Sequence, residues 1–95
     1  MAIQMRRLRD TATTTAAKVL SASSTRRALQ IYAVDGDLYA ALLDAGAVAG
    51  DTTADDVKIA QGKVWVFSEN TVPSNEVWIR SSTGNVKYVV YYSEG

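Results

Sequence analysis

Apolar and polar residues alternate with a period of two through much of the second half of the chain. The segments are 57-VKIA-60, 63-KVWVF-67, 76-EVWIRS-81 and 86-VKYVVYY-92. Side chains of a β-strand point alternately to its two faces, so each segment is predicted to be a strand. A Gln-Gly pair, a loop with the only proline and the sequence STGN separate these segments. Because glycine and proline favour turns, we expect four short strands joined by turns.

The first half of the chain is less regular. Residues 13–20 carry threonine and valine and fit a first strand, although their alanines also permit a helix. Segment 28-ALQIYAV-34 alternates and predicts a second strand. The Asp35-Gly36 pair after it is typical of a two-residue hairpin, so 37-DLYAAL-42 is expected to be the returning strand.

Residues 38–45 leave two interpretations open. They fit the returning strand, but they also fit an alanine- and leucine-rich helical turn that ends at Gly46. Residues 43–56 contain small residues, two glycines and several aspartates, and are expected to form an irregular crossover.

These patterns predict an all-β protein. About six to seven short antiparallel strands in one domain are typical of a small β-sandwich or barrel. The chain lacks long stretches of helical period and βαβ alternation. We expect a basic, extended N-terminal arm at residues 1–12 and a single β domain at residues 13–95.

Three of the predicted strands carry bulky apolar residues on both faces. In the last strand one face holds Val86, Tyr88, Val90 and Tyr92, and the other holds Lys87, Val89 and Tyr91. Likewise Trp65 and Phe67 lie opposite Val64 and Val66, and Trp78 lies opposite Val77 and Ile79. A sandwich strand usually leaves one polar face to water. Local loops or the arm can cover a second apolar face, but we favour other copies of the chain or another protein.

Charge divides the chain in two. Residues 1–30 hold six basic residues and one aspartate, a net charge of +5, whereas residues 31–95 hold four basic and nine acidic residues, a net charge of −5. The two parts attract each other, either within one subunit or between copies. The chain has no histidine and no cysteine, which excludes Cys–His and Ser–His–Asp catalytic sites and ordinary zinc sites.

Candidate ligand chemistry is weak. Oxygen ligands for calcium exist at Asp35, Asp37, Asp44, Asp51, Asp55 and Asp56. Their spacing matches no EF-hand loop, and aspartate is an ordinary turn residue, so we expect no metal and no cofactor. The arginines accompany no nucleic-acid-binding motif in a chain without net charge, so no nucleic-acid partner is expected. No apolar run reaches the roughly 20 residues of a transmembrane helix, and no membrane partner is expected.

The order of short motifs resembles small virion proteins of tailed bacteriophages. In that family an arginine-rich turn leads into a leucine-x-isoleucine strand, a later strand ends in a Gln-Gly or Pro-Gly turn, and a valine-proline loop precedes two final strands. The corresponding residues here are Arg26, Arg27, Leu29, Ile31, Gln61, Gly62, Val72, Pro73, Ser81, Ser82, Glu94 and Gly95. The resemblance covers about two-thirds of the chain. Residues 1–20 do not match, and residues 43–56 are longer and richer in alanine than the family pattern.

The resemblance implies a small β-sandwich, often a homotrimer, that acts as a decoration or cement protein on a bacteriophage capsid. Its partners would be the major capsid protein and other copies of itself, and it would be made in the host cytoplasm and reside on the virion. A head-fibre, collar or tail component, a carbohydrate-binding host-recognition module, and, last, a carboxylate-dependent hydrolase are the alternatives. The residues expected to form the interface are Arg6, Arg7, Arg9, Arg26, Arg27, Trp65, Phe67, Trp78, Tyr88, Tyr91 and Tyr92.

Overall fold

The computed structural model describes residues 5–47, 57–67 and 71–94, and these residues contain strands but no helix. The eight strands are β1 (Arg6–Ala12), β2 (Ala17–Leu20), β3 (Arg26–Ala33), β4 (Leu38–Leu43), β5 (Val57–Ile59), β6 (Val64–Phe67), β7 (Glu76–Ser81) and β8 (Val86–Glu94). The prediction of an all-β domain is therefore confirmed, with one strand more than the upper expected number.

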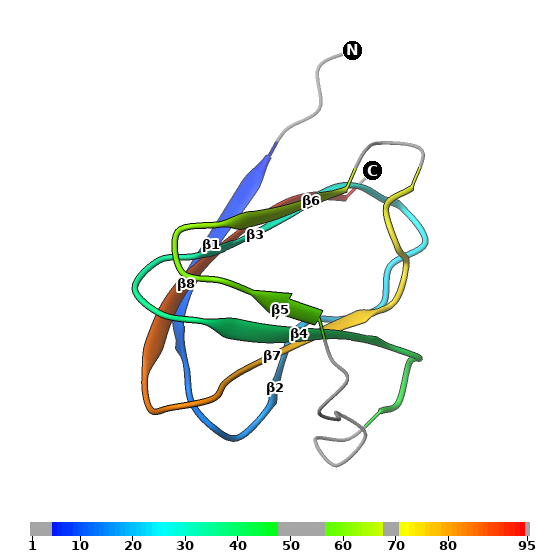
Figure 1. The fold of residues 1–95 in the computed structure, drawn as a ribbon. Helices are drawn as coiled ribbons and strands as arrows, with labels where there is room; N and C mark the ends of the chain where they lie inside the picture. Colours follow the sequence, from blue (N-terminus) through cyan, green and yellow to red (C-terminus); the bar gives the residue numbers. More distant parts are fainter. Residues whose placement is uncertain (1–4, 48–56, 68–70, 95) are drawn as a thin grey trace.

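The strands form two four-stranded sheets that lie as two layers (Figure 1). One sheet has the order β1-β8-β3-β6, which we call sheet A, and the other has the order β2-β7-β4-β5, which we call sheet B. All neighbouring strands are antiparallel. Almost every connection crosses from one sheet to the other, and the two orders are those of an eight-stranded jelly roll.

The additional strand is β1, which occupies most of the segment that was expected to be an arm. Its register with β8 is continuous from Arg6 opposite Tyr92 to Ala12 opposite Val86. Leu8 packs against the core and Ala12 is buried, so the segment has an inner face. The arginines of β1 obscure the alternation of its inward and outward side chains in the sequence, and the pairing with β8 makes that alternation evident.

Strand β4 settles the choice between strand and helix at residues 38–45. It pairs with β7 over its whole length and with β5 over its first three residues, and Leu38 and Ala40 point into the core. Asp44, Ala45 and Gly46 follow it as a turn, and the rest of the expected crossover, residues 48–56, lies outside the described residues.

The expected hairpin at Asp35-Gly36 is wrong, because β3 and β4 belong to different sheets and do not pair. Gly36 does not have the positive φ that such a turn uses. Glycine is required there for space, since an added Cβ would lie 2.7 Å from a methyl carbon of Val86. The turn therefore carries the chain across the end of the sandwich, where it packs against the first residue of β8.

The core lies between the two sheets. Leu29 and Ile31 of β3, Leu38 of β4, Val77 of β7 and Val90 of β8 are completely buried or nearly so. These strands are the central ones of each sheet, so their inner faces meet apolar side chains from all sides. Among the described strands, the four outermost, β1, β6, β2 and β5, each have one edge without a partner strand.

Candidate interaction surface

The eleven residues expected at an interface fall into three groups. Arg6, Arg7, Arg9, Arg27 and Tyr91 are exposed, Trp65, Phe67 and Tyr92 are partly buried, and Arg26, Trp78 and Tyr88 are buried. The structure therefore brings only part of the set to one surface, and the rest stabilises the fold of the single chain.

Three of the exposed residues, Arg7, Arg9 and Tyr91, meet on the outer face of sheet A. The strand registers define two rows that cross the sheet from β1 to β6: Arg7, Tyr91, Gln30 and Val66 form one, and Arg9, Val89, Tyr32 and Val64 form the other. We call these eight residues the open face. Its central and β6 positions are almost all apolar or aromatic, and its β1 positions are arginines.

The open face exposes more apolar surface than single scattered residues would. Val64 and Val66 are 51% and 53% exposed, and Tyr91 is 37% exposed. Full burial of a valine contributes ~1.5–3 kcal/mol, so covering the exposed half of each valine would contribute about 1 kcal/mol. A partner on this face would therefore gain free energy at several adjacent positions, which is typical of a protein contact surface.

The arginines give this face a basic border. Arg6, Arg7 and Arg9 are exposed along β1 and make no ion pair with another described residue. On β8, Lys87 adds a further positive charge to the outward side, opposite Thr11. The face and its border are thus suited to an acidic protein surface, because opposite charges steer and orient an encounter.

The aromatic residues of β6 point to the other side of the sheet. The Trp65 and Phe67 rings pack against the core with their centroids 4.5 Å apart at an angle of 50°. Val64 and Val66 therefore take the outward positions that the predicted interface had assigned to their aromatic neighbours. The two large rings bury more apolar area than valines would, which favours their inward placement.

Trp78 is buried on the outer side of sheet B. It lies in a small cluster with Ala16 and Ala41, against which Leu43 and Ala47 pack. The second apolar face of β7 is therefore covered by the chain itself, through the residues before β2 and the turn after β4.

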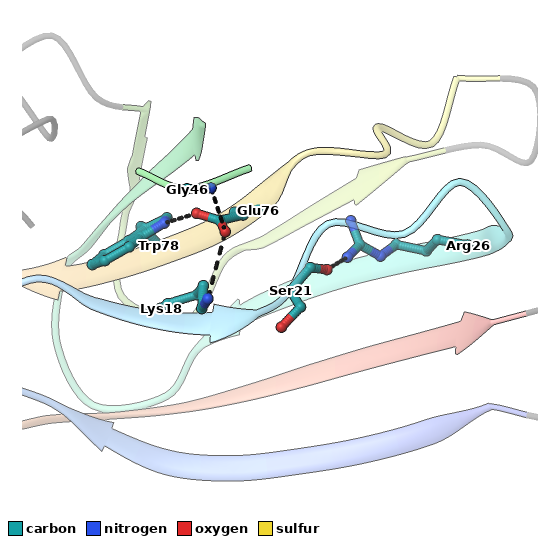
Figure 2. A network of polar contacts seen from close by, with 6 residues as sticks. All are labelled: Lys18, Ser21, Arg26, Gly46, Glu76 and Trp78. Carbon is teal, nitrogen blue, oxygen red and sulfur yellow. Dashed lines mark hydrogen bonds and ion pairs between the residues drawn. The ribbon is translucent and has the colours of Figure 1, made fainter. Parts of the chain in front are cut away.

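Glu76 holds this cover in place (Figure 2). Its Oε1 accepts a hydrogen bond from the Trp78 indole at 3.0 Å, and its Oε2 accepts one from the Gly46 amide at 3.2 Å. The Lys18 ammonium lies 3.5 Å from the same Oε2. These contacts, the Trp78 bond first, lower the pKa of the Glu76 carboxyl, because they favour its charged form.

Arg26 is a structural residue in this chain. Its side chain is buried, and its guanidinium donates to the carbonyl oxygens of Ser21, Pro73 and Asn75 at 2.7–3.0 Å. Figure 2 shows the bond to Ser21 at the start of the loop before β3. Arg26 thereby joins two loops that are far apart in the sequence, and it does not contribute to the open face.

Tyr88 is also part of the core. Its neighbours across β1 and β3 are Asp10 and Ala33. Burial, with a smaller effect of the Asp10 charge, raises the pKa of Tyr88 to about 12. The phenol is therefore neutral at physiological pH and acts as an apolar side chain with a hydroxyl group.

The described carboxylates that were candidates for chemistry serve turns. Asp35 accepts a hydrogen bond from the Lys87 amide at 2.7 Å. Asp37 accepts one from the Gln61 amide at 2.9 Å and lies 3.4 Å from the Lys58 ammonium. The Gln61 bond is the main cause of the lowered pKa of Asp37. Asp51, Asp55 and Asp56 lie outside the described residues.

A groove of about 540 Å³ runs beside β1 and β8, next to the open face. Its lining residues are Arg9, Asp10, Thr11, Val34, Lys87, Tyr88 and Val89. Within the described part of the chain, no three acidic residues converge as metal ligands. The described residues also contain no helix that is long and apolar enough to cross a membrane.

The comparisons with known proteins bear on the fold. No family model and no curated protein matches the chain. A solved structure described by the words "Bacillus endospore appendages form a novel family of disulfide-linked pili" is similar with a TM-score of 0.55. The two chains are 17% identical, and the similarity covers 99% of this chain and 88% of the other. This similarity shows that the two chains have a similar fold.

Proposed function

We propose that this protein is a non-enzymatic structural subunit of an extracellular assembly and docks through the open face. The observation that carries the proposal is the open face, on which exposed Val64 and Val66 at the β6 edge and Tyr91 next to Arg7 share one side of sheet A. A buried aromatic and aliphatic contact supplies most of the affinity of such an interface, and bordering charges mainly steer the encounter.

The chemistry of the described residues supports a structural role. Glu76, Asp35 and Asp37 are engaged with backbone amides, and the sequence has no histidine or cysteine to act as base or nucleophile. The fold similarity to a pilus protein points in the same direction, since that protein is also an assembly subunit by its description.

Decoration of a bacteriophage capsid is the finer proposal, and it rests on the resemblance of the short motifs to tailed-phage virion proteins. A decoration protein requires a stable small domain and a surface that recognises the shell. The basic border at Arg7 and Arg9 suits an acidic shell surface. Further copies of the chain, as in the trimers that the resemblance implies, would add contacts of the same kind.

An appendage subunit is the second candidate, favoured by the similarity over almost the whole chain to a protein of disulfide-linked pili. This chain has no cysteine, so its copies cannot be linked by disulfides to one another. A fibre of this protein would be held together by non-covalent contacts alone.

Immunogold labelling of particles and cell surfaces from the source culture tests these roles. Label over the whole head of a virion supports capsid decoration, label at one vertex or on the tail supports a fibre or tail part, and label along a filament supports an appendage. Absence of the protein from every such assembly would overturn the structural role. A glycan array then tests carbohydrate binding, although Trp78 is not available on the surface of the single chain.

A further inference from the structure

The four edge strands of the sandwich differ in charge. Three of them carry cations on the strand itself: β1 has three arginines, β2 has Lys18 and β5 has Lys58. Strand β6, with the sequence VWVF, carries no charge. Charged residues on edge strands prevent pairing with other chains, so the described structure has protected three edges and left one unprotected.

The register shows which backbone groups the β6 edge presents. The Ala33 amide donates to the Lys63 carbonyl at 3.1 Å, and the Ala33 carbonyl accepts from the Gly62 amide at 2.8 Å, so the Lys63 carbonyl points toward β3. Hydrogen-bonded and non-hydrogen-bonded pairs alternate along antiparallel strands. Trp65 and Phe67 therefore direct their amides and carbonyls toward β3. Those of Val64 and Val66 point away from β3, toward the edge.

We infer that the β6 edges of two copies pair antiparallel about a two-fold axis that passes beside Trp65. Val64 of each copy would then lie opposite Val66 of the second copy as a hydrogen-bonded pair, so the N–H group and the carbonyl of each valine gain partners. The two A sheets would become one sheet of eight strands. This inference does not depend on which assembly the protein serves, but it gives a two-fold dimer and not the trimer that the bacteriophage resemblance implies.

Side-chain placement agrees with this pairing. The outward valines of both copies would lie side by side, so the two open faces would form one continuous apolar surface. On the inner side, the partly exposed Trp65 of one copy would face Trp65 of the second copy and cover its remaining exposed edge. The pairing therefore buries apolar groups on both sides of the new strand pair.

Charge favours pairing of β6 with β6 of a second copy over the other pairings of edge strands. Pairing of β1 with a second β1 would set exposed arginines against arginines, and β6 offers no carboxylate to a foreign β1. In the two-fold pair the two β1 strands lie at opposite ends of eight strands, about 34 Å apart at ~4.8 Å per strand. That separation exceeds the Debye length of about 8 Å at physiological ionic strength, so their repulsion is screened.

The test is the solution mass of the full chain, measured by light scattering on a sizing column over a concentration series. The expected result is a shift toward twice the monomer mass of 10.2 kDa as concentration rises. Val66→Lys adds a charge at an outward position and is expected to abolish the shift, while the urea midpoint measured at a concentration at which the wild type is monomeric stays unchanged. Val57→Lys is the matched control, because Val57 is 44% exposed on the already protected β5 edge.

A wild-type protein that stays monomeric at all concentrations, forms a trimer, or keeps its dimer in the Val66→Lys variant would overturn the inference. The register has its own test, since the chain has no cysteine of its own. When equal amounts of the Val64→Cys and Val66→Cys variants are mixed and oxidised, the mixed disulfide is expected to exceed each homodisulfide by clearly more than the twofold excess of random pairing, and a ratio at or below twofold would contradict the register. A preference for one homodisulfide would exclude the proposed register.

Discussion

The outer faces of both sheets carry large apolar side chains, but the chain covers them on sheet B and leaves them exposed on sheet A. On sheet B, Trp78 is 8% exposed because Ala16, the turn after β4 and Glu76 cover it. On sheet A, Tyr91 and the valines of β6 are exposed to solvent, and no described loop covers them. The difference shows that an apolar second face has two distinct outcomes, and the local sequence of the strand does not distinguish them.

Mutations on the covered face of sheet B should lower the free energy of unfolding of the isolated protein, because that face is packed within the folded chain. Mutations on the open face should leave this free energy almost unchanged and should weaken the binding of a partner. The following three experiments test this contrast, from the largest expected effect on stability to the smallest.

Replacement of Trp78 by alanine should give the largest loss. It removes a buried indole and leaves a cavity beneath the turn at Gly46 and Ala47, so we expect a destabilisation of ~3–5 kcal/mol. Urea unfolding at pH 7, followed by circular dichroism, measures it. Tyr91→Ala on the open face is the matched control, and an equal loss in both variants would refute the contrast between the faces.

The contacts of Glu76 that hold the turn at Gly46 over Trp78 should contribute less to the free energy of unfolding in acid. Because the pKa of Glu76 is lowered in the folded chain, its contribution to stability is complete above the ordinary glutamate pKa of about 4.3 and disappears as pH falls through the lowered value. Wild type should therefore exceed Glu76→Gln in free energy of unfolding at pH 7, and the gap should narrow below about pH 4. Urea titrations from pH 7 to the acid limit give this difference.

Asp37 provides the control for the acid dependence of stability, since its pKa is also lowered, by contacts at the other end of the sandwich. Asp37→Asn should leave the acid dependence of Glu76 intact. A gap between wild type and Glu76→Gln that stays constant with pH would show that the carboxylate does not hold the cover.

Polar substitution on the open face should have the smallest effect on the isolated chain. The Val64→Ser and Val66→Ser double variant changes two side chains that are already half in water, so we expect a shift of at most ~0.5 kcal/mol per site at low protein concentration. Binding of the same variant to its assembly should fall clearly, as measured by cosedimentation with particles. A large loss of stability without loss of binding would assign these valines to the fold.

Much of the fold follows from alternation in the sequence. The segments expected as strands at 28–34, 63–67, 76–81 and 86–92 all contain strands, and the residues that share a face do so in the structure. In β8 the inward set and the outward set are those that the alternation predicts. Strand β1 was missed because arginines and one aspartate occupy four of its seven positions and obscure the alternation.

The candidate surface was harder to predict. Trp65, Phe67, Trp78 and Tyr88 were assigned to an interface because they are large aromatics, but each faces the core or is covered by the chain. Arg26 was assigned to the interface together with the other arginines, yet it donates to three carbonyls from two distant loops. In each case the deciding contacts come from residues remote in sequence.

The sequence by itself determined the strand character of most segments, the pairs of residues that share a side, and the lack of histidine and cysteine chemistry. A period of two is a local property of the backbone and can be recognised in a few residues. The tertiary structure alone decided which side of each strand faces the core, which apolar face a loop covers, and which edge remains uncharged and unpaired. Those outcomes depend on strand pairing between distant segments, which a local sequence pattern does not contain.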